Sequence, residues 1–302
     1  MNYDCAVKGE NISKKFKTFT LDIPDLRVPN GFATALIGEN GAGKTTLLNM
    51  LSGIRLDYKG ELTFFDKYSS EEKERRADVK NRIGYTGTGR YYLPQWTVSD
   101  VEEISSLLFD NFDRDVFERY CRELAIFPDS PNGVALKKKC SALSDGTRTK
   151  LAGAMARDTD LLLLDEPASP LDPLMRDKLC QMIGDYISDG AGEKSVLFST
   201  HNISDMESIT DYAIIMEHGN VVECGFVEDL KEKYILIKGD AQDAEAASKI
   251  LYTMTKNPYG FEGICLAENL DKLAGMNVSK EIPSLFQISV AVMKNNTKMV
   301  LK

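Results

Sequence analysis

A glycine-rich stretch early in the chain has the residue types that bind phosphate. Residues 38–46 fit the pattern G-x-x-x-x-G-K-[ST] at every specified position. In this pattern the glycines let backbone N–H groups curl around a polyphosphate, Lys44 reaches the β and γ phosphates, and the Thr45 hydroxyl ligates Mg²⁺. The apolar run 32–37 precedes the stretch and the helix-forming run 46–51 follows it. We therefore expect a nucleotide triphosphate site formed by Gly38, Glu39, Asn40, Gly41, Ala42, Gly43, Lys44, Thr45 and Thr46.

Two acidic residues follow a wholly apolar run further along the chain. Residues 161–164 are four leucines, which is typical of a central parallel strand, so Asp165 and Glu166 are expected at the carboxyl edge of a sheet. There Asp165 would hold Mg²⁺ through water, and Glu166 would orient and deprotonate the attacking water. The ordinary alternative is a strand that ends in a helix-capping acid. The phosphate-binding stretch upstream favours the catalytic interpretation.

A histidine ends a second apolar strand. Residues 195–200 are followed by His201, one of only two histidines in the chain. At a strand terminus, His201 is placed to donate a hydrogen bond to a γ-phosphate and so to sense whether that group is present. The other histidine, His218, stands in a turn-like sequence and is interpreted as a hairpin residue.

Two further features each leave two interpretations open. Ser144 or Asp145 is placed to cap a helix over 148–157, with Gly146 between them and the helix. The positive N-terminal end of this helix either meets an anion or is an ordinary helix start. Phe16 lies 22 residues before Gly38 and either stacks on an adenine ring or packs on a sheet.

Length and composition are those of an ordinary globular protein with one or two domains: 302 residues, 43% hydrophobic and 27% charged. No apolar run approaches the roughly 18 residues that span a bilayer, and the N-terminus lacks the pattern of a signal peptide. We expect a cytosolic chain. The six scattered cysteines form no C-x-x-C pair, and the net charge of −9 disfavours a broad nucleic-acid surface, so no nucleic-acid partner is expected.

The pattern of apolar and polar residues divides the chain into several parts. Residues 1–30 indicate a small antiparallel strand group, and 66–157 a mostly helical insertion in which Val101, Ile104, Leu107 and Leu108 share one face. The tail 231–302 reads as strand 234–238, helix 243–256, strand 263–267 and amphipathic helix 283–294.

Together, and in this order along the chain, the motifs make residues 1–230 resemble the ATP-binding-cassette (ABC) ATPases. The resemblance implies an α/β fold: a P-loop NTPase core, an antiparallel β subdomain, an inserted helical subdomain at about 66–157 and a small C-terminal α/β appendage at 231–302. It implies ATP and Mg²⁺ as ligands, an adenine-stacking Phe16, the phosphate loop 38–46, and Asp165, Glu166 and His201 at their family positions. It also implies that two cassettes dimerise head to tail, with Ser144 and Gly146 of one facing the nucleotide of the other.

Three positions depart from the family pattern. Asp145 stands for a glycine and puts a carboxylate near the partner cassette's phosphates, Thr88 stands for a longer glutamine, and Pro170 stands for a glycine between Ser169 and Leu171. Hydrolysis should survive these changes because Lys44, Asp165, Glu166 and His201 are intact, whereas its rate and coupling are open.

The main hypothesis is the ATPase subunit of a membrane transporter, most similar to bacterial ABC-2 type exporters, whose tails often contain a helix starting as Pro283-Ser284-Leu285 does here. It would dock peripherally on the inner face of the cell membrane against a separate permease, and would use the aromatic residues of the segment 84–98 as the docking surface. The alternative is that these aromatic residues belong to the core of the helical subdomain. Two other hypotheses are a soluble ABC ATPase acting on ribosomes or nucleic acid, and a weakly hydrolysing, nucleotide-gated subunit of a homo- or heterodimer. The docking segment contains Tyr91, Tyr92, Leu93 and Trp96.

Overall fold

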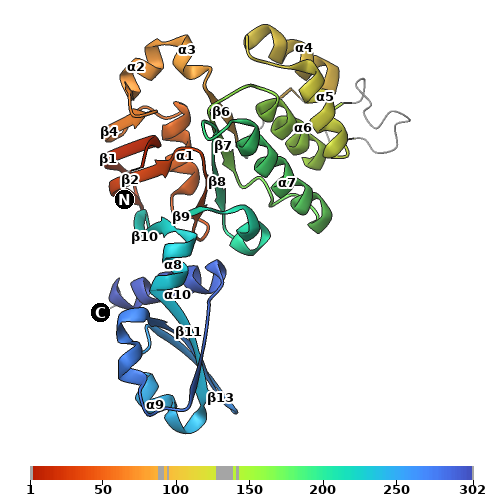
Figure 1. The fold of residues 1–302 in the computed structure, drawn as a ribbon. Coiled ribbons are helices and arrows are strands. Elements are labelled where there is room, and N and C mark those ends of the chain that lie inside the picture. Colours follow the sequence, from red (N-terminus) through yellow and green to blue (C-terminus); the bar gives the residue numbers. More distant parts are fainter. Residues whose placement is uncertain (1–2, 88–91, 94, 127–138, 141–142, 301–302) are drawn as a thin grey trace.

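The computed structural model describes residues 3–87, 92–93, 95–126, 139–140 and 143–300, with the backbone alone for 143–147 and 297–300. Within these residues the chain forms three sheets. Figure 1 shows two of them in a larger upper unit and the third in a smaller lower unit.

The central sheet of the upper unit has the strand order β10-β9-β3-β8-β7-β6. Neighbouring strands run parallel except β9 and β10, which form an antiparallel pair. Every residue of β3, β7, β8 and β9 is buried, which explains why these strands are mostly apolar and do not alternate between apolar and polar residues. The strands are β3 (Ala33–Ile37), β6 (Ile83–Thr86), β7 (Leu161–Asp165), β8 (Ser195–Thr200), β9 (Tyr212–Glu217) and β10 (Asn220–Phe226).

A second, antiparallel sheet is built mainly from the N-terminal hairpin. Its order is β2-β1-β4-β5, from β1 (Cys5–Lys15), β2 (Thr20–Pro29), β4 (Lys59–Phe64) and β5 (Tyr68–Ser69). The helix α1 (Lys44–Ser52) buries Leu47, Leu48, Met50 and Leu51 in one core with residues of both sheets. This core holds the phosphate loop, which ends at α1, firmly against the central sheet. The predicted α/β class with an antiparallel subdomain is confirmed.

A layer of helices covers the other face of the central sheet. It contains α4 (Val98–Leu108), α5 (Arg114–Glu123), α6 (Leu143–Met155) and α7 (Pro173–Asp189) (Figure 1). Of these, α6 and α7 contact strands of the sheet, and α4 and α5 pack against α6. Thr97, Asp113 and Asp172 cap the starts of α4, α5 and α7 with their side chains. On α4 Val101 is fully buried, whereas Leu107 and Leu108 are 78% and 68% exposed, so the expected apolar face of this helix is only partly covered.

The boundary of about 66–157 is too wide for this helical layer. The short helices α2 (Ser70–Arg75) and α3 (Ala77–Lys80) pack beside β4 and β5 instead. Buried Lys73 of α2 donates to the Leu51 carbonyl at the end of α1, and Val79 of α3 joins the core beneath the antiparallel sheet. The next segment, β6, belongs to the central sheet.

The lower unit is an antiparallel sheet with short helices on one face. The short helices η1 (Ile203–Asp205) and η2 (Glu207–Ile209) lie between β8 and β9. After β10, α8 (Val227–Lys233) leads into the sheet β12-β13-β11-β14. Its elements are β11 (Tyr234–Asp240), η3 (Ala241–Asp243), α9 (Ala244–Ala247), β12 (Thr253–Asn257), β13 (Gly260–Leu266), η4 (Ala267–Leu273) and β14 (Val278–Glu281).

The helix expected at 243–256 was wrong over most of its length. The chain is helical only through α9, and Thr253–Asn257 is a strand paired with β13. The turn explains the difference: the side chain of Asn257 accepts hydrogen bonds from the backbone N–H of Tyr259 and Gly260, which closes a β-hairpin. Tertiary pairing outweighs the helical preference of the alanines upstream.

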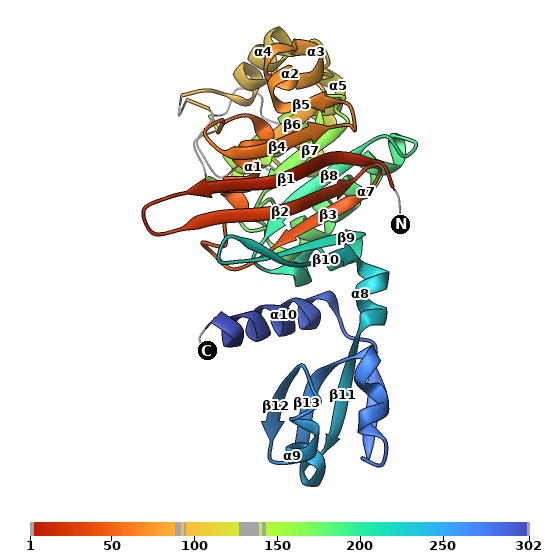
Figure 2. The same cartoon turned by 90° about the vertical axis from the view of Figure 1, so that its left-hand side faces the viewer.

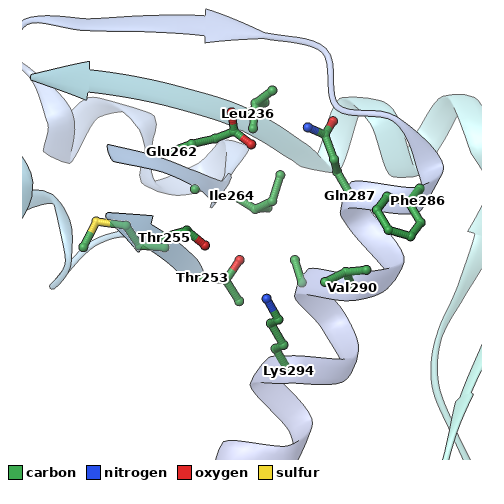
Figure 3. Close-up of a pocket in the computed structure, with 12 residues that line it drawn as sticks. Leu236, Thr253, Thr255, Glu262, Ile264, Phe286, Gln287, Val290 and Lys294 are labelled. Carbon is green, nitrogen blue, oxygen red and sulfur yellow. The ribbon is translucent and has the colours of Figure 1, made fainter. Parts of the chain in front are cut away.

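The last helix, α10 (Leu285–Val300), lies between the two units (Figure 2). Ser284 and Gln287 cap its start reciprocally through side chain and backbone. Leu285, Ile288, Ala291 and Val292 are buried in the same core as the helices of the upper unit. On the other side of α10, a cavity of about 350 Å³ opens toward β11–β13 (Figure 3). In the described part of the chain, no helix is long and apolar enough to cross a membrane.

Candidate active site

Three neighbouring strands of the central sheet end at one edge and bring the predicted residues together. β3 leads into the phosphate loop, β7 ends at Asp165, and β8 leads into His201. The register pairs Asp165 with Ser199 and Ile37 with Thr200, so the three strand ends are level. The backbone N–H of Gly38 also donates to the Thr200 carbonyl at 3.3 Å, which ties the phosphate loop to β8. Parallel strands therefore deliver residues far apart in the sequence to one site.

The phosphate loop requires glycine at its turning points. Gly41 and Gly43 have φ of 90° and 105°, in the left-handed region that L side chains rarely adopt. At Gly43 a Cβ would also lie 2.8 Å from Leu21 and 2.9 Å from Phe19. No side chain caps α1, so its first backbone N–H groups are available to an anion. The loop is thus shaped by its backbone to receive phosphate groups.

Lys44 is 5% exposed and crosses back over the loop. Its Nζ donates to the carbonyls of Gly38 at 2.7 Å and Glu39 at 3.2 Å, and lies 3.4 Å from a carboxylate oxygen of Glu166. These acceptors therefore hold the ammonium group in place. The phosphate oxygens of a bound nucleotide would replace them or add to them as hydrogen-bond acceptors.

The next residue, Thr45, faces Asp165. The Thr45 hydroxyl donates to Asp165 Oδ2 at 2.9 Å, and the Ser199 hydroxyl donates to Asp165 Oδ1 at 2.6 Å. Ser199 Oγ also accepts from the backbone N–H of Glu166 at 2.9 Å. A hydroxyl beside a fixed carboxylate is a set of hard oxygen donors, which suits Mg²⁺. The residues present fit the expected ion.

Glu166 and His201 form a direct pair. His201 Nδ1 lies 2.8 Å from Glu166 Oε2, while the other carboxylate oxygen faces Lys44. Glu166 has φ of 52°, a conformation that costs a non-glycine residue roughly 1–3 kcal/mol and is common at functional sites. The carboxylate is thus held between two nitrogen donors at the mouth of the site.

Aromatic side chains from the β1–β2 hairpin form the outer wall. Phe16 and Phe19 lie 5.8 Å apart between ring centroids and line a cavity of about 740 Å³ together with the phosphate loop and Glu166. The Arg55 guanidinium lies 5.3 Å from the Phe16 ring centroid and Lys14 Nζ 5.8 Å from it. Phe16 borders this cavity and packs on Phe19, and its role in adenine stacking stays a prediction.

The structure therefore brings together the phosphate loop, Phe16, Asp165, Glu166 and His201. Sequence reasoning missed Ser199, which fixes Asp165 and the Glu166 backbone, although its place one residue before the strand end was a usable signal. His218 lies in the β9–β10 turn with φ of 47°, as predicted for a hairpin residue.

The remaining predicted residues lie at the start of α6 or outside the described residues. The helix expected over 148–157 begins earlier, because α6 starts at Leu143; Ser144, Asp145 and Gly146 therefore lie in its first turn, where only the backbone is described, and neither Ser144 nor Asp145 is the cap that precedes it. Thr88 and Tyr91 lie outside the described residues.

Comparisons with known proteins agree with the geometry. Residues 21–169 match the model of the ABC transporter family. An uncharacterized ABC transporter ATP-binding protein of Nostoc sp. is 29% identical, covering 87% of this chain and 77% of the relative. An energy-coupling factor transporter ATP-binding protein of Lactobacillus gasseri is 25% identical, covering 82% and 85%.

Solved structures show the same fold. An ATP-binding subunit of an ABC transporter superposes with a TM-score of 0.61 at 20% identity, covering 75% of this chain and 92% of that one. A dimeric ATP-binding cassette bound to ADP and Pi gives the same TM-score at 20% identity, covering 73% and 98%. The chain therefore contains an ABC ATPase domain and is similar over most of its length to ABC transporter ATP-binding proteins.

Proposed function

We propose that this chain binds and hydrolyses ATP to power export across the cytoplasmic membrane through a separate permease subunit. The observation that supports this most directly is the convergence of Lys44, the Thr45–Asp165 pair and the Glu166–His201 pair at one sheet edge. These are the groups that phosphoryl transfer to water needs, because it depends on positioning and charge neutralisation.

Each residue has a role that follows from its contacts. The phosphate loop and Lys44 bind the phosphates, and Phe16 stacks on the adenine. Thr45 and Asp165 hold Mg²⁺, which when bound neutralises charge on the phosphates. Glu166 accepts a proton from the attacking water, and His201 orients the Glu166 carboxylate and reaches the γ-phosphate.

A second cassette completes the site in this proposal. The start of α6, with Ser144 and Gly146, would face the nucleotide of the partner cassette, where a hydroxyl and helix N-terminal amides suit a γ-phosphate. ATP would then hold two cassettes together, and its hydrolysis would release them. The partner is a second copy of this chain or a different cassette.

The membrane partner would dock in a groove beside the helical layer. The hollow is lined by Tyr92 and Trp96, whose rings lie 6.0 Å apart and stacked, with Val101, Ile104 and Leu108 of α4. Tyr92 and Trp96 also pack against the core, so they shape the groove rather than project from it. A permease would place the chain peripherally on the inner face of the membrane. The Pro283-Ser284-Leu285 start of α10 supports export, through its likeness to tails of ABC-2 type exporters.

The test replaces Glu166 with Gln. The variant should bind Mg-ATP normally, hydrolyse it at least about a hundredfold more slowly, and accumulate as an ATP-bound dimer in size-exclusion chromatography. Glu228→Gln, an exposed acid on α8, is the matched control and should behave as wild type. The same negligible turnover in wild type and Glu166→Gln, measured with the membrane partner present, would refute the hydrolytic role.

That same outcome would favour a second candidate, a nucleotide-gated subunit with little turnover. Asp145 and Thr88 motivate it, because Asp145 adds a carboxylate to the helix start that faces the partner's phosphates and Thr88 is shorter than the glutamine for which it stands.

A further inference from the structure

The groove beside the helical layer contains a buried cation that lacks an acidic partner. Two adjoining hollows of about 310 and 400 Å³ share the residues Tyr85, Phe109 and Arg157. We call the two hollows together the Arg157 groove. Trp96 and α4 residues line one end of it, and Ile54, Lys73 and Asn81 line the other. Arg157 therefore lies at its middle.

Arg157 is 9% exposed. Its guanidinium stacks on the Phe109 ring, with Cζ 3.8 Å from the centroid, and one terminal nitrogen donates to the Asn81 carbonyl at 3.3 Å. Its Nε has no hydrogen-bond partner. Among the described residues no carboxylate forms an ion pair with Arg157. Burial lowers its pKa to about 10, and the one charge effect that opposes this shift comes from the Tyr186 phenol, not from a carboxylate.

The rest of the groove does not supply the missing negative charge. Although the chain has a net charge of −9, no Asp or Glu stands among the described residues that line the two hollows. Lys150 lines the same hollow as Trp96 and donates to the Gly87 carbonyl at 3.1 Å, and burial lowers its pKa. The lining thus carries cationic side chains and no carboxylate, although Glu74 pairs with Lys73 and Lys80 at the end of the groove away from Trp96.

An uncompensated buried charge is costly, and the cost is recovered when a carboxylate arrives in good geometry. A guanidinium is suited to this because it binds a carboxylate through two parallel hydrogen bonds. The neighbouring lining is aromatic and aliphatic, which suits the apolar face of a helix better than a free small anion. Charge and shape together indicate a helix with one acidic residue among apolar ones.

We propose that the Arg157 groove receives a helix of the membrane subunit that presents a single Asp or Glu to the Arg157 guanidinium, flanked by apolar side chains that contact Trp96 and α4. This inference rests on the proposed function, in that the occupant is the transporter's membrane subunit. Arg157 selects the partner by charge, while the aromatic and aliphatic lining supplies contact area.

The first experiment uses peptides and tests Arg157 alone. Trp96 is the single tryptophan of the chain, so its fluorescence reports occupancy of the groove. The probes are two tryptophan-free amphipathic helical peptides that differ only in a central Glu or Gln. We expect the Glu peptide to bind wild type at least about tenfold more tightly than the Gln peptide, and salt to reduce the difference.

Arg157→Met should bind both peptides equally. The matched control is Arg82→Met, because Arg82 also stacks on an aromatic ring, at 3.9 Å from Phe65, but is paired with Asp160 and does not line the groove. This control should keep the preference for Glu. Equal affinities for wild type, or no binding of either peptide to it, would overturn the inference.

The second experiment uses the membrane subunit that co-purifies with the chain from its native membrane. Arg157→Glu should lose this assembly while still binding Mg-ATP, and Arg157→Lys should keep part of it. Retained assembly with Arg157→Glu contradicts the inference and leaves the proposed function standing. If wild type itself assembles with no membrane subunit, the proposed function fails, and the peptide experiment still decides what Arg157 recognises.

Discussion

Two sites on the upper unit, the nucleotide edge and the Arg157 groove, each contain a buried cation, but they differ in the acceptors that surround it. At the nucleotide edge, Lys44 is 5% exposed and has two carbonyl acceptors and a nearby carboxylate. In the Arg157 groove, Arg157 is 9% exposed and has one carbonyl and an aromatic ring. The first site is organised before its ligand arrives. The second lacks a partner that must come from another molecule.

Of the substitutions that test this comparison, Lys44→Met should have the largest effect, which is on ATP affinity. Loss of the ammonium group removes charge-assisted bonds to the phosphates, and ATP affinity should fall roughly a hundredfold. A fluorescent ATP analogue measures the affinity, and Lys59→Met, an exposed lysine on β4, is the control. Unchanged affinity in the Lys44 variant would show that the nucleotide edge is not the binding site.

A smaller effect is expected at Ser199. Ser199→Ala removes the hydroxyl that fixes both Asp165 and the backbone of Glu166, so the Mg²⁺ concentration for half-maximal ATPase should rise and kcat should fall about tenfold. Ser195→Ala provides the control on the same strand, because Ser195 bonds Asn30 and Gly31 at the opposite end of β8. Identical Mg²⁺ dependence in the two variants would mean that the network around Asp165 is not pre-organised by Ser199.

The smallest effect is expected for the stability of Arg157→Met. Removing an unpaired buried charge should leave the free energy of unfolding unchanged or slightly higher, whereas Arg82→Met should lower it by up to about 1 kcal/mol as its part-exposed ion pair is lost. Urea unfolding of the chain without partner measures both. If Arg157→Met were destabilised by more than about 2 kcal/mol, the guanidinium would be a structural group. The contrast between the nucleotide edge and the Arg157 groove would then fail.

Much of the nucleotide edge could be predicted from sequence because its determinants are local. The glycines at 41 and 43 mark a backbone that turns through left-handed conformations, and the apolar runs before Asp165 and His201 identify buried strands. Parallel strands then place these residues at one edge, without any knowledge of side-chain contacts.

Other features depend on contacts between distant segments and were not predictable in this way. Arg157 follows a helix and resembles any helix-end cation, and its isolation is evident only from its contacts with Asn81 after α3 and Phe109 after α4. The strand at 253–257 forms because β13 pairs with it, although the preceding residues favour a helix. The extent of the helical layer was misjudged for the same reason, since α2 packs beside β4 and β5 of the antiparallel sheet and α3 packs against α2.

The position of α10 has a practical consequence for work on this protein. Its residues Leu285, Ile288, Ala291 and Val292 share a core with the helical side of the cassette, and Asn296 donates to the buried Glu217 at the end of β9. A shortened chain that stops at residue 230 would expose this apolar surface to water and invite aggregation. The C-terminal segment is thus a fixed part of the folding unit, and recombinant versions should retain it through to the final helix.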